Sequence, residues 1–332
     1  MSAETTPRAL VSSPLMPEFD RESGSRRLFH LIEFLREAGY AVSFTTQDSD
    51  GDSRYVRMLQ QKGVATYRGF GRYSRNLFQF GRLDVAIFAF WHHAEAHIEA
   101  LRSASPETRI IVDAIDLHWL RQARRSFLYD SDDYSVEGLD SAFAAEMVRE
   151  MNTYAAADAV LTVSDKEAHT LNDILSDRSF AYPVPDCEDI TPSNVPFDER
   201  RGILFVGNFN HPPNAAAAAF LCENILPELD AELLEKHPIY IVGNGTTGPV
   251  VKYGSESPYV RVVGWVPSLT PYLERAAISV VPLRYGAGTK RKLGLLTSSW
   301  IVPNWFTMVW FSTFGPVCLS CHAFRWSGER RS

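Results

Sequence analysis

Short apolar runs alternate with longer helix-like segments along most of this chain, and the alternation limits the fold more than any other feature. Residues 8–13, 41–46, 84–90 and 109–116 are such runs, and segment 25–40 carries leucines at helical spacing. Strands of nearly continuous apolar character are typical of sheets that are buried on both faces. Strand, helix and strand in this order predict a parallel sheet covered by helices, which is the doubly wound α/β class.

A proline-rich segment interrupts the alternation once. Residues 183–201, "PVPDCEDITPSNVPFDERR", hold four prolines and several acidic residues without an apolar period, as linkers do. The alternation then restarts with a second series of apolar runs, at 202–209, 239–245, 259–266 and 278–286. We therefore expect two Rossmann-like domains that face a cleft, with ligands at the carboxyl ends of the strands. The predicted boundaries are 1–182, a linker at 183–201, and 202–293.

Composition narrows the class of partner and the compartment. The chain has 332 residues and a formal net charge of −7, which argues against a nucleic-acid partner because phosphate backbones require concentrated Lys and Arg. Its first twenty residues lack the basic and apolar regions of a signal peptide. Four cysteines in a chain this long do not form a disulfide framework. A cytoplasmic location is expected.

One candidate site follows the first apolar run of the second domain. In "FVGNFNHPPNAAAAAF", Gly207, Asn208 and His211 come directly after a strand, and Asn214 is a candidate N-cap for the alanine-rich helix. A glycine turn that opens onto a helix N-terminus suits a phosphate, because unpaired N–H groups converge there. The alternative is an ordinary strand-to-helix turn. The stretch is not a GxGxxG motif, so a nicotinamide cofactor is not expected.

A second candidate is the basic loop "RYGAGTKRK". Arg284, Gly286, Gly288 and Lys290 follow another apolar run, so the glycines would let the backbone approach a diphosphate while the cations neutralise it. The alternative is a solvated basic loop. We favour the binding loop because Arg284 directly follows a buried run.

Together these stretches resemble a known enzyme family. "FVGNFNHPPN", "VRVVGWVPSLTPYLERAAISVVPLRYGAGTKRK", "IVDAIDLHWLRQAR" and "AAADAVLTVSDKE" look like bacterial family-4 glycosyltransferases of the GT-B fold, over residues 8–293. The resemblance implies an acceptor-binding first domain and a second domain that binds a nucleotide-sugar donor. It also implies glycosyl transfer with retention, in glycan biosynthesis, without a bound metal or a tightly bound cofactor. The acceptor (a glycan, a lipid-linked or a small molecule) stays open, as does peripheral association with the inner face of the membrane.

The resemblance also assigns roles to residues of the second domain. Arg284 and Lys290 would hold the donor diphosphate and stabilise the charge of the leaving group. The backbone of the segment 264–266 would meet the nucleobase. The donor-binding residues implied in this domain are Gly207, Asn208, His211, Gly264, Val266, Gly286 and Gly288.

In the first domain the resemblance implies a donor contact and a catalytic pair. Gly24, in "RESGSRR", matches a loop that approaches the donor phosphates. Asp116 and His118 end a buried run and are the favoured catalytic residues. His92 and His93 also follow a run, but a lone histidine is more often a hydrogen-bonded structural residue.

The family pattern stops at Leu293. Residues 293–324 contain no Asp, Glu, Lys or Arg, and the glutamate that the family carries beyond the basic loop is absent, since no carboxylate lies between Arg291 and Glu329. We therefore expect an incomplete second domain followed by an aberrant tail at 294–332. A frameshifted or truncated gene is the favoured explanation. A membrane anchor and a divergent completion of the domain are the alternatives, and the CxxCH pattern in "CLSCH" is attributed to chance.

Two other classes of function compete with transfer. A non-catalytic protein that binds nucleotide sugars or carbohydrates would keep the site and lose turnover. An epimerase of the same architecture would need carboxylates and histidines arranged for elimination, which the motifs do not suggest. The donor sugar, the base and the acceptor cannot be derived from these residues.

Overall fold

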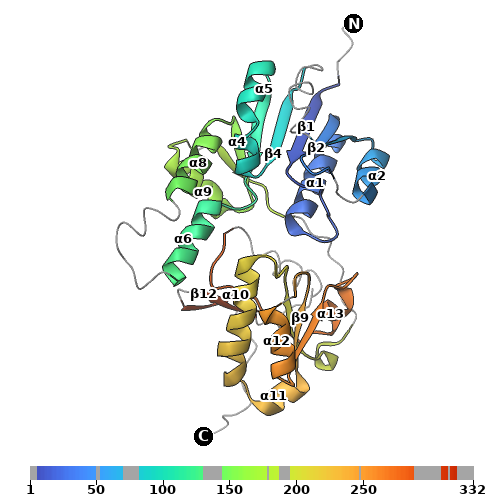
Figure 1. Cartoon of the computed structure of the whole chain (residues 1–332), viewed down its shortest axis with the longest axis vertical. Helices are drawn as coiled ribbons and strands as arrows, with labels where there is room; N and C mark the ends of the chain where they lie inside the picture. Colours follow the sequence, from blue (N-terminus) through green and yellow to red (C-terminus); the bar gives the residue numbers. More distant parts are fainter. Residues whose placement is uncertain are drawn as a thin grey trace. The chain divides into compact units, whose positions relative to one another are not determined.

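The computed structural model describes residues 6–49, 53–69, 82–129, 144–177, 179–186, 195–246, 248–287, 308–312 and 315–319 (Figure 1). The chain divides into two compact units, and the division falls between Cys187 and Glu188, inside the predicted linker. Each unit has its own sheet and its own hydrophobic core.

The first unit is built on a seven-stranded parallel sheet. Its strands lie in the order β3-β2-β1-β4-β5-β6-β7. They are β1 (Arg8–Ser13), β2 (Ala41–Thr46), β3 (Ala65–Arg68), β4 (Val85–Ala89), β5 (Arg109–Asp113), β6 (Ala159–Thr162) and β7 (Ala181–Pro183). The order reverses between β1 and β4, the arrangement that creates a ligand site at the carboxyl ends of the strands in other open α/β sheets.

Helices cover both faces of this sheet, as the continuous apolar strands require. They are α1 (Ser23–Glu37), α2 (Ser53–Gln61), α4 (Trp91–Glu95), α5 (Ile98–Ala104), α6 (His118–Tyr129), α8 (Ala144–Ala155) and α9 (Asp165–Ile174). Successive residues of β1 point to opposite faces: Val11 packs with Leu28 and Ile32 of α1, whereas Leu10 packs in the cluster that contains Leu101 of α5.

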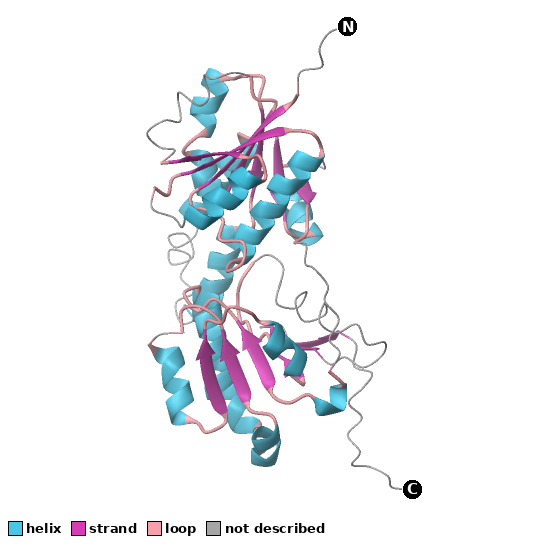
Figure 2. Ribbon diagram, turned by 90° about the vertical axis from the view of Figure 1, so that its right-hand side faces the viewer, coloured by secondary structure: helices cyan, strands magenta, loops and turns pink. Residues whose placement is uncertain are grey.

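The second unit repeats the architecture with four parallel strands in the order β10-β9-β8-β11 (Figure 2). The strands are β8 (Ile203–Val206), β9 (Ile239–Val242), β10 (Val260–Gly264) and β11 (Ile278–Ser279). The helices are α10 (Pro212–Phe220), α11 (Ala231–Lys236), α12 (Pro249–Glu256) and α13 (Thr270–Arg275), and the short turns η1 (Phe197–Glu199), η2 (Leu221–Ile225) and η3 (Leu226–Glu228) accompany them. Phe205 and Ile241 pack on one face of the sheet, and Leu204 and Val242 pack on the other.

The predicted fold class of two doubly wound parallel sheets is confirmed, and two local predictions are wrong. The strand expected at 278–286 ends at Ser279: the Val280 N–H still donates to the Leu204 carbonyl at 2.9 Å, but Pro282 has no N–H to continue the ladder. Asn214 is not the N-cap of α10, because the helix begins two residues earlier at Pro212 and His211 is its N-cap. Proline suits the first helical turn, where its missing N–H has no partner to lose.

Little of the predicted tail at 294–332 falls among the described residues. Its strands β12 (Met308–Ser312) and β13 (Gly315–Leu319) pair antiparallel in a separate two-stranded sheet, with Met308 opposite Leu319. Among the described helices, none combines the length and the apolar character that a bilayer crossing requires.

A glycine contact brings the loops after β8 and β9 together. Gly243 has φ 141°, and a Cβ on it would lie 1.9 Å from the carbonyl oxygen of Gly207. Only glycine permits this backbone approach, because any side chain would overlap the neighbouring peptide.

Gly243→Ala should therefore destabilise the second unit by about 3 kcal/mol or more, because the β8 and β9 loops would have to separate. The control is Gly39→Ala after α1, since Gly39 also has positive φ (89°) but open space around its Cβ position, so it should cost only about 1–2 kcal/mol. Urea unfolding of both variants measures the difference. Equal losses would contradict the steric account.

Candidate functional site

Three loops meet at the carboxyl edge of the second sheet. The Gly207 N–H donates to the Val242 carbonyl at 3.0 Å, the Gly243 N–H donates to the Gly264 carbonyl at 2.8 Å, and the Phe209 N–H donates to the Asn244 carbonyl at 2.7 Å. These bonds join the loops after β8, β9 and β10 side by side.

Two of the predicted donor-binding glycines, Gly207 and Gly264, thus belong to one cluster. Sequence reasoning missed its central member, the β9 loop with Gly243, Asn244 and Gly245. The sequence did contain a sign of this loop, because Gly-Asn follows β9 at residues 243–244 just as Gly-Asn follows β8 at residues 207–208.

Asparagine side chains hold the loop between β8 and α10. Asn208 Oδ1 accepts from the Asn210 N–H at 3.1 Å, and the Asn208 carbonyl accepts from Asn214 Nδ2 at 2.7 Å. Asn214 is 8% exposed, so this second bond is shielded from water. The exposed His211 is the N-cap of α10 and ends the loop that these two asparagine hydrogen bonds hold in place.

The β10 loop presents an aromatic side chain next to a glycine. Gly264 has φ 82°, and a side chain there would approach Thr246 Oγ1 to 3.3 Å. Trp265 is 52% exposed, whereas Val266 packs partly on the core. The segment predicted to meet a nucleobase therefore lies at the same edge as the glycine cluster.

Arg284 lies in a different place from the glycine loops. Its Cζ is 5.3 Å from the centroid of the Phe220 ring, and Phe220 is the last residue of α10. Nine helical residues span about 12 Å, so the guanidinium stacks toward the end of α10 opposite His211. Gly286 is buried with φ 146°, while the predicted residues Gly288 and Lys290 lie outside the described residues.

In the first unit the predicted pair Asp116 and His118 is brought together. His118 Nε2 lies 3.3 Å from Asp116 Oδ1, and the Arg121 guanidinium contacts Asp116 Oδ2. Burial by itself raises the pKa of Asp116, but the hydrogen bond from His118 and the charge of Arg121 outweigh it, so the pKa of Asp116 is lowered. Asp116 is an ionised acceptor.

Glu150 of α8 holds the N-terminus of α6, and sequence reasoning missed it. Its carboxylate accepts from the His118 N–H at 3.0 Å, from the Trp119 N–H at 2.9 Å and from the Tyr154 hydroxyl at 2.8 Å. A single glutamate in a helical pattern gives no sequence signal of this role.

Rings gather around His118. The ring centroids of Phe90 and His92 are 5.5 Å apart, and those of His92 and His118 are 5.7 Å apart. Burial lowers the pKa of His92, and the neighbouring His118 imidazole lowers it further. His92 therefore favours its neutral form.

Backbone strain marks the same edge. Phe90 (φ 68°) and Ile115 (φ 62°) adopt the left-handed region just after the neighbouring strands β4 and β5. Such conformations cost about 1–3 kcal/mol each and cluster at functional sites.

His93 is a buried hydrogen-bonded residue. Its Nε2 lies 2.8 Å from Ser12 Oγ, which accepts from Thr45 Oγ1 at 2.9 Å. Burial lowers the pKa of His93 to about 3, and the neighbouring His97 contributes. His93 is thus neutral and joins α4 to β1 and β2.

Gly24 lies in the first turn of α1, where a Cβ would approach Ile115 at an ordinary 3.7 Å. One turn later Arg27 makes a buried ion pair with Asp113 at 2.8 Å, which ties α1 to β5. The same guanidinium donates to the Val184 carbonyl beyond β7.

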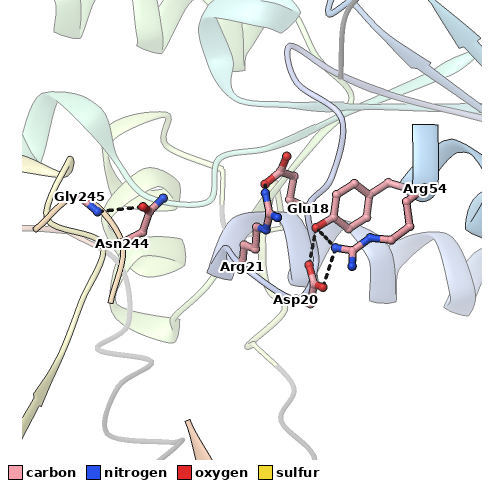
Figure 3. Close-up of polar contacts among 7 residues, drawn as sticks. Glu18, Asp20, Arg21, Arg54, Asn244 and Gly245 are labelled. Carbon is pink, nitrogen blue, oxygen red and sulfur yellow. Dashed lines mark hydrogen bonds and ion pairs between the residues drawn. The ribbon is translucent and has the colours of Figure 1, made fainter. Parts of the chain in front are cut away.

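The loop that leads into α1 is also fixed (Figure 3). The hydroxyl of the buried Tyr55 donates to Asp20 at 2.5 Å, and Arg54 pairs with the same carboxylate at 2.8 Å. Arg21 pairs with Glu18 at 3.1 Å within the loop.

A comparison with protein families finds a match for the second unit. Residues 200–295 match the family model described as Glycosyl transferases group 1. This part of the chain is a glycosyltransferase domain. The match ends two residues beyond Leu293, where the sequence departs from the family pattern. No curated protein matches the chain.

Solved structures of glycosyltransferases share the fold. A variant of TarM from S. aureus, in complex with fondaparinux, alpha-GlcNAc-glycerol and UDP, has a TM-score of 0.63 at 7% identity, covering 92% of this chain and 85% of its own. Sucrose-phosphate synthase from Thermosynechococcus elongatus has a TM-score of 0.56 at 14% identity, with coverages of 83% and 75%. A trehalose 6-phosphate synthase from Burkholderia multivorans has a TM-score of 0.56 at 11% identity, with coverages of 92% and 84%. The chain therefore has the GT-B fold.

The Asp116 cluster should give the first unit a pH-dependent stability. Because the pKa of Asp116 is lowered on folding, its contribution is complete above the ordinary value of 3.8 and is lost as pH falls through the lower folded value. Asp116→Asn should therefore cost about 1.5–3 kcal/mol at pH 7 and distinctly less below pH 3.8.

Urea unfolding of the wild type and the variant at both pH values measures this difference. Asp173→Asn, at an exposed position of α9, is the control and should change stability little at either pH. A cost of Asp116→Asn that does not depend on pH would contradict an ionised, paired Asp116.

Proposed function

We propose that this glycosyltransferase moves a sugar from a nucleotide-sugar donor, held by the second unit, to an acceptor held by the first. The transfer proceeds with retention of the anomeric configuration and without a tightly bound metal or cofactor. Acceptor candidates are a glycan, a lipid-linked molecule or a small molecule. The reaction takes place on the cytoplasmic side, in solution or at the membrane surface.

The glycine cluster is the observation that carries this proposal. Gly207, Gly243 and Gly264 bring the backbones of three loops together at the carboxyl edge of a parallel sheet, within the segment that matches the glycosyl transferases group 1 family. Backbone N–H groups at such an edge bind diphosphates without a metal. The solved TarM complex, which contains UDP, supports a nucleoside diphosphate as the occupant.

The charge and hydrogen-bonding capacity of the side chains suggest a role for each catalytic residue. Arg284 and Lys290 would neutralise the diphosphate as it leaves, and charge stabilisation of this kind is usually the largest single contribution to catalysis. For Arg284 this requires the guanidinium to leave the Phe220 ring when donor binds. Asp116 and His118 would orient a hydroxyl at the edge of the first sheet, and Gly24 would approach the donor phosphates.

A second candidate is a protein that binds nucleotide sugars without transferring them. The absence of any carboxylate between Arg291 and Glu329 favours it, because the family carries a donor-binding glutamate in this region. Loss of this glutamate would weaken the hold on the donor sugar and reduce turnover, while the loops after β8, β9 and β10 would still meet the nucleoside diphosphate.

Incubation of the chain with radiolabelled UDP-, GDP- and ADP-sugars tests the proposal, with hydrolysis and transfer scored separately. Arg284→Ala should weaken binding of the matching nucleoside diphosphate about 10-fold to 100-fold, since a hydrogen bond to a charged group is worth about 1.5–3 kcal/mol. Arg261→Ala, at an exposed position of β10, is the matched control.

Three outcomes separate the candidates. Turnover supports the transferase, and binding without turnover supports the non-catalytic protein. Absence of binding by every nucleotide sugar, or equal affinity of the two arginine variants, would contradict the proposed donor site.

A further inference from the structure

The loop after β9 contains the only Asn–Gly pair of the sequence, Asn244–Gly245. An asparagine followed by glycine deamidates more readily than other asparagines, because no side chain shields its amide from the next backbone nitrogen. Asn–Gly pairs are also common in ordinary turns, where both residues tolerate positive φ. The dipeptide alone therefore does not identify a reactive site, but the geometry of this loop does.

The side-chain amide of Asn244 lies directly beside the nitrogen that would attack it (Figure 3). The Gly245 N–H donates to Asn244 Oδ1 at 2.9 Å, and Asn244 is exposed to water. A C=O bond is about 1.2 Å long, so the amide carbon lies within about 4 Å of the Gly245 nitrogen. When this nitrogen loses its proton, the lone pair that remains points along the former N–H bond, toward the amide.

The peptide group between the two residues is held in a way that favours the loss of this proton. Its carbonyl oxygen accepts from the Phe209 N–H at 2.7 Å. Negative charge moves onto this oxygen when the Gly245 nitrogen is deprotonated, and a hydrogen bond to a charged oxygen is stronger than one to a neutral oxygen. The Phe209 N–H therefore stabilises the attacking form and fixes the orientation of the peptide.

The fold requires glycine at position 245. Gly245 has φ 74°, and a Cβ there would lie 2.5 Å from the backbone nitrogen of Asn210. A side chain that could shield Asn244 is therefore excluded by the contact that packs the β9 loop against the β8 loop.

Asn210 provides an internal comparison. It is exposed like Asn244 and lies at the same edge of the sheet, but His211 follows it and carries a side chain. The His211 N–H donates to the Asn208 carbonyl at 3.2 Å, away from the Asn210 amide. Of these two exposed asparagines, only Asn244 meets the conditions for attack.

We propose that Asn244 is a site of spontaneous deamidation, and that this modification weakens diphosphate binding by the second unit. The Gly245 nitrogen gives up its proton to hydroxide and forms a bond to Cγ of Asn244. The bond from Cγ to the amide nitrogen breaks, and that nitrogen takes a proton from water and leaves as ammonia. Water then opens the five-membered imide at either carbonyl, which leaves aspartate or isoaspartate and adds one negative charge.

The new charge would lie on the central loop of the glycine cluster. A carboxylate there repels a diphosphate. Isoaspartate also lengthens the main chain next to Gly243, whose Cβ position already lies 1.9 Å from the Gly207 carbonyl oxygen. The effect on binding rests on the proposed function, whereas the deamidation does not.

Incubation of the full chain at mildly alkaline pH, followed by peptide mass spectrometry, tests the modification. The peptide that contains Asn244 should gain the mass that separates a carboxyl group from a carboxamide, and faster at higher pH because the attacking nitrogen must lose its proton. Asn210 is the control in the same sample and should stay unmodified, and trypsin separates the two sites at Lys236. Asn244→Gln should also stay unmodified, since its imide would be a six-membered ring that forms far more slowly.

A short unstructured peptide with the sequence of residues 240–248 sets the time of the incubation. An Asn244 that remains intact in the full chain while this peptide deamidates would overturn the proposal. Equal reaction at Asn210 would do so as well, because the geometry around Gly245 would then have no effect.

Binding of UDP, GDP and ADP then tests the consequence. Asn244→Asp carries the charge of the product without the longer main chain, and it should bind the preferred diphosphate about 5-fold or more weakly than the fresh wild type. High salt should reduce this loss, because screening weakens charge repulsion and does not reverse a steric change. During incubation the wild type should lose affinity in step with deamidation, whereas Asn244→Gln should keep its own starting affinity.

Affinity that is unchanged in both Asn244→Asp and the deamidated wild type would overturn the effect on binding. A fresh chain that binds none of the three diphosphates would reject the proposed function and this effect together. Deamidation of Asn244, measured by mass, would still stand in that case.

Discussion

The buried ion pair of Arg27 and Asp113 is the interaction on which the first unit's edge depends. Both side chains are almost inaccessible to water, and one guanidinium joins α1, the end of β5 and the carbonyl of Val184 beyond β7. A buried pair adds little net stability, but loss of one partner is costly because the other charge stays unpaired. The pair therefore acts mainly by fixing geometry: it holds Gly24 beside the strand whose end carries Asp116 and His118.

The second unit holds its edge without buried charge. Close backbone contact between Gly207 and Gly243, with the hydrogen bond from Gly243 to Gly264, aligns three loops. The exposed side chains of Trp265 and His211 lie at this edge, whereas Asp116, His118 and His92 lie at the edge of the first unit. This difference is in line with the proposal that the second unit binds a diphosphate and the first unit binds a hydroxyl group.

The sequence predicted the parts of this arrangement that depend on local pattern. The strands at 8–13 and 41–46 have the predicted bounds, because short apolar runs between polar segments mark buried parallel strands well. Glu150 and Gly243 were missed because their roles come from residues far along the chain or from backbone approach. Asn214 was misassigned because two prolines start α10 earlier, and its amide braces Asn208 instead. The positions of Asp116, His118, Gly207 and Gly264 were predictable, since each lies at or just after the end of a strand.

The central claim is that the carboxyl-edge loops of the glycosyltransferase domain bind a nucleoside diphosphate. Hydrogen–deuterium exchange of the full chain, with and without the best-binding nucleoside diphosphate, tests it most directly. The account predicts that slowed exchange concentrates in the loops after β8, β9 and β10, at residues 207–211, 243–246 and 264–266. Protection confined to the first unit, or to α11 at the opposite end of β9, would contradict it.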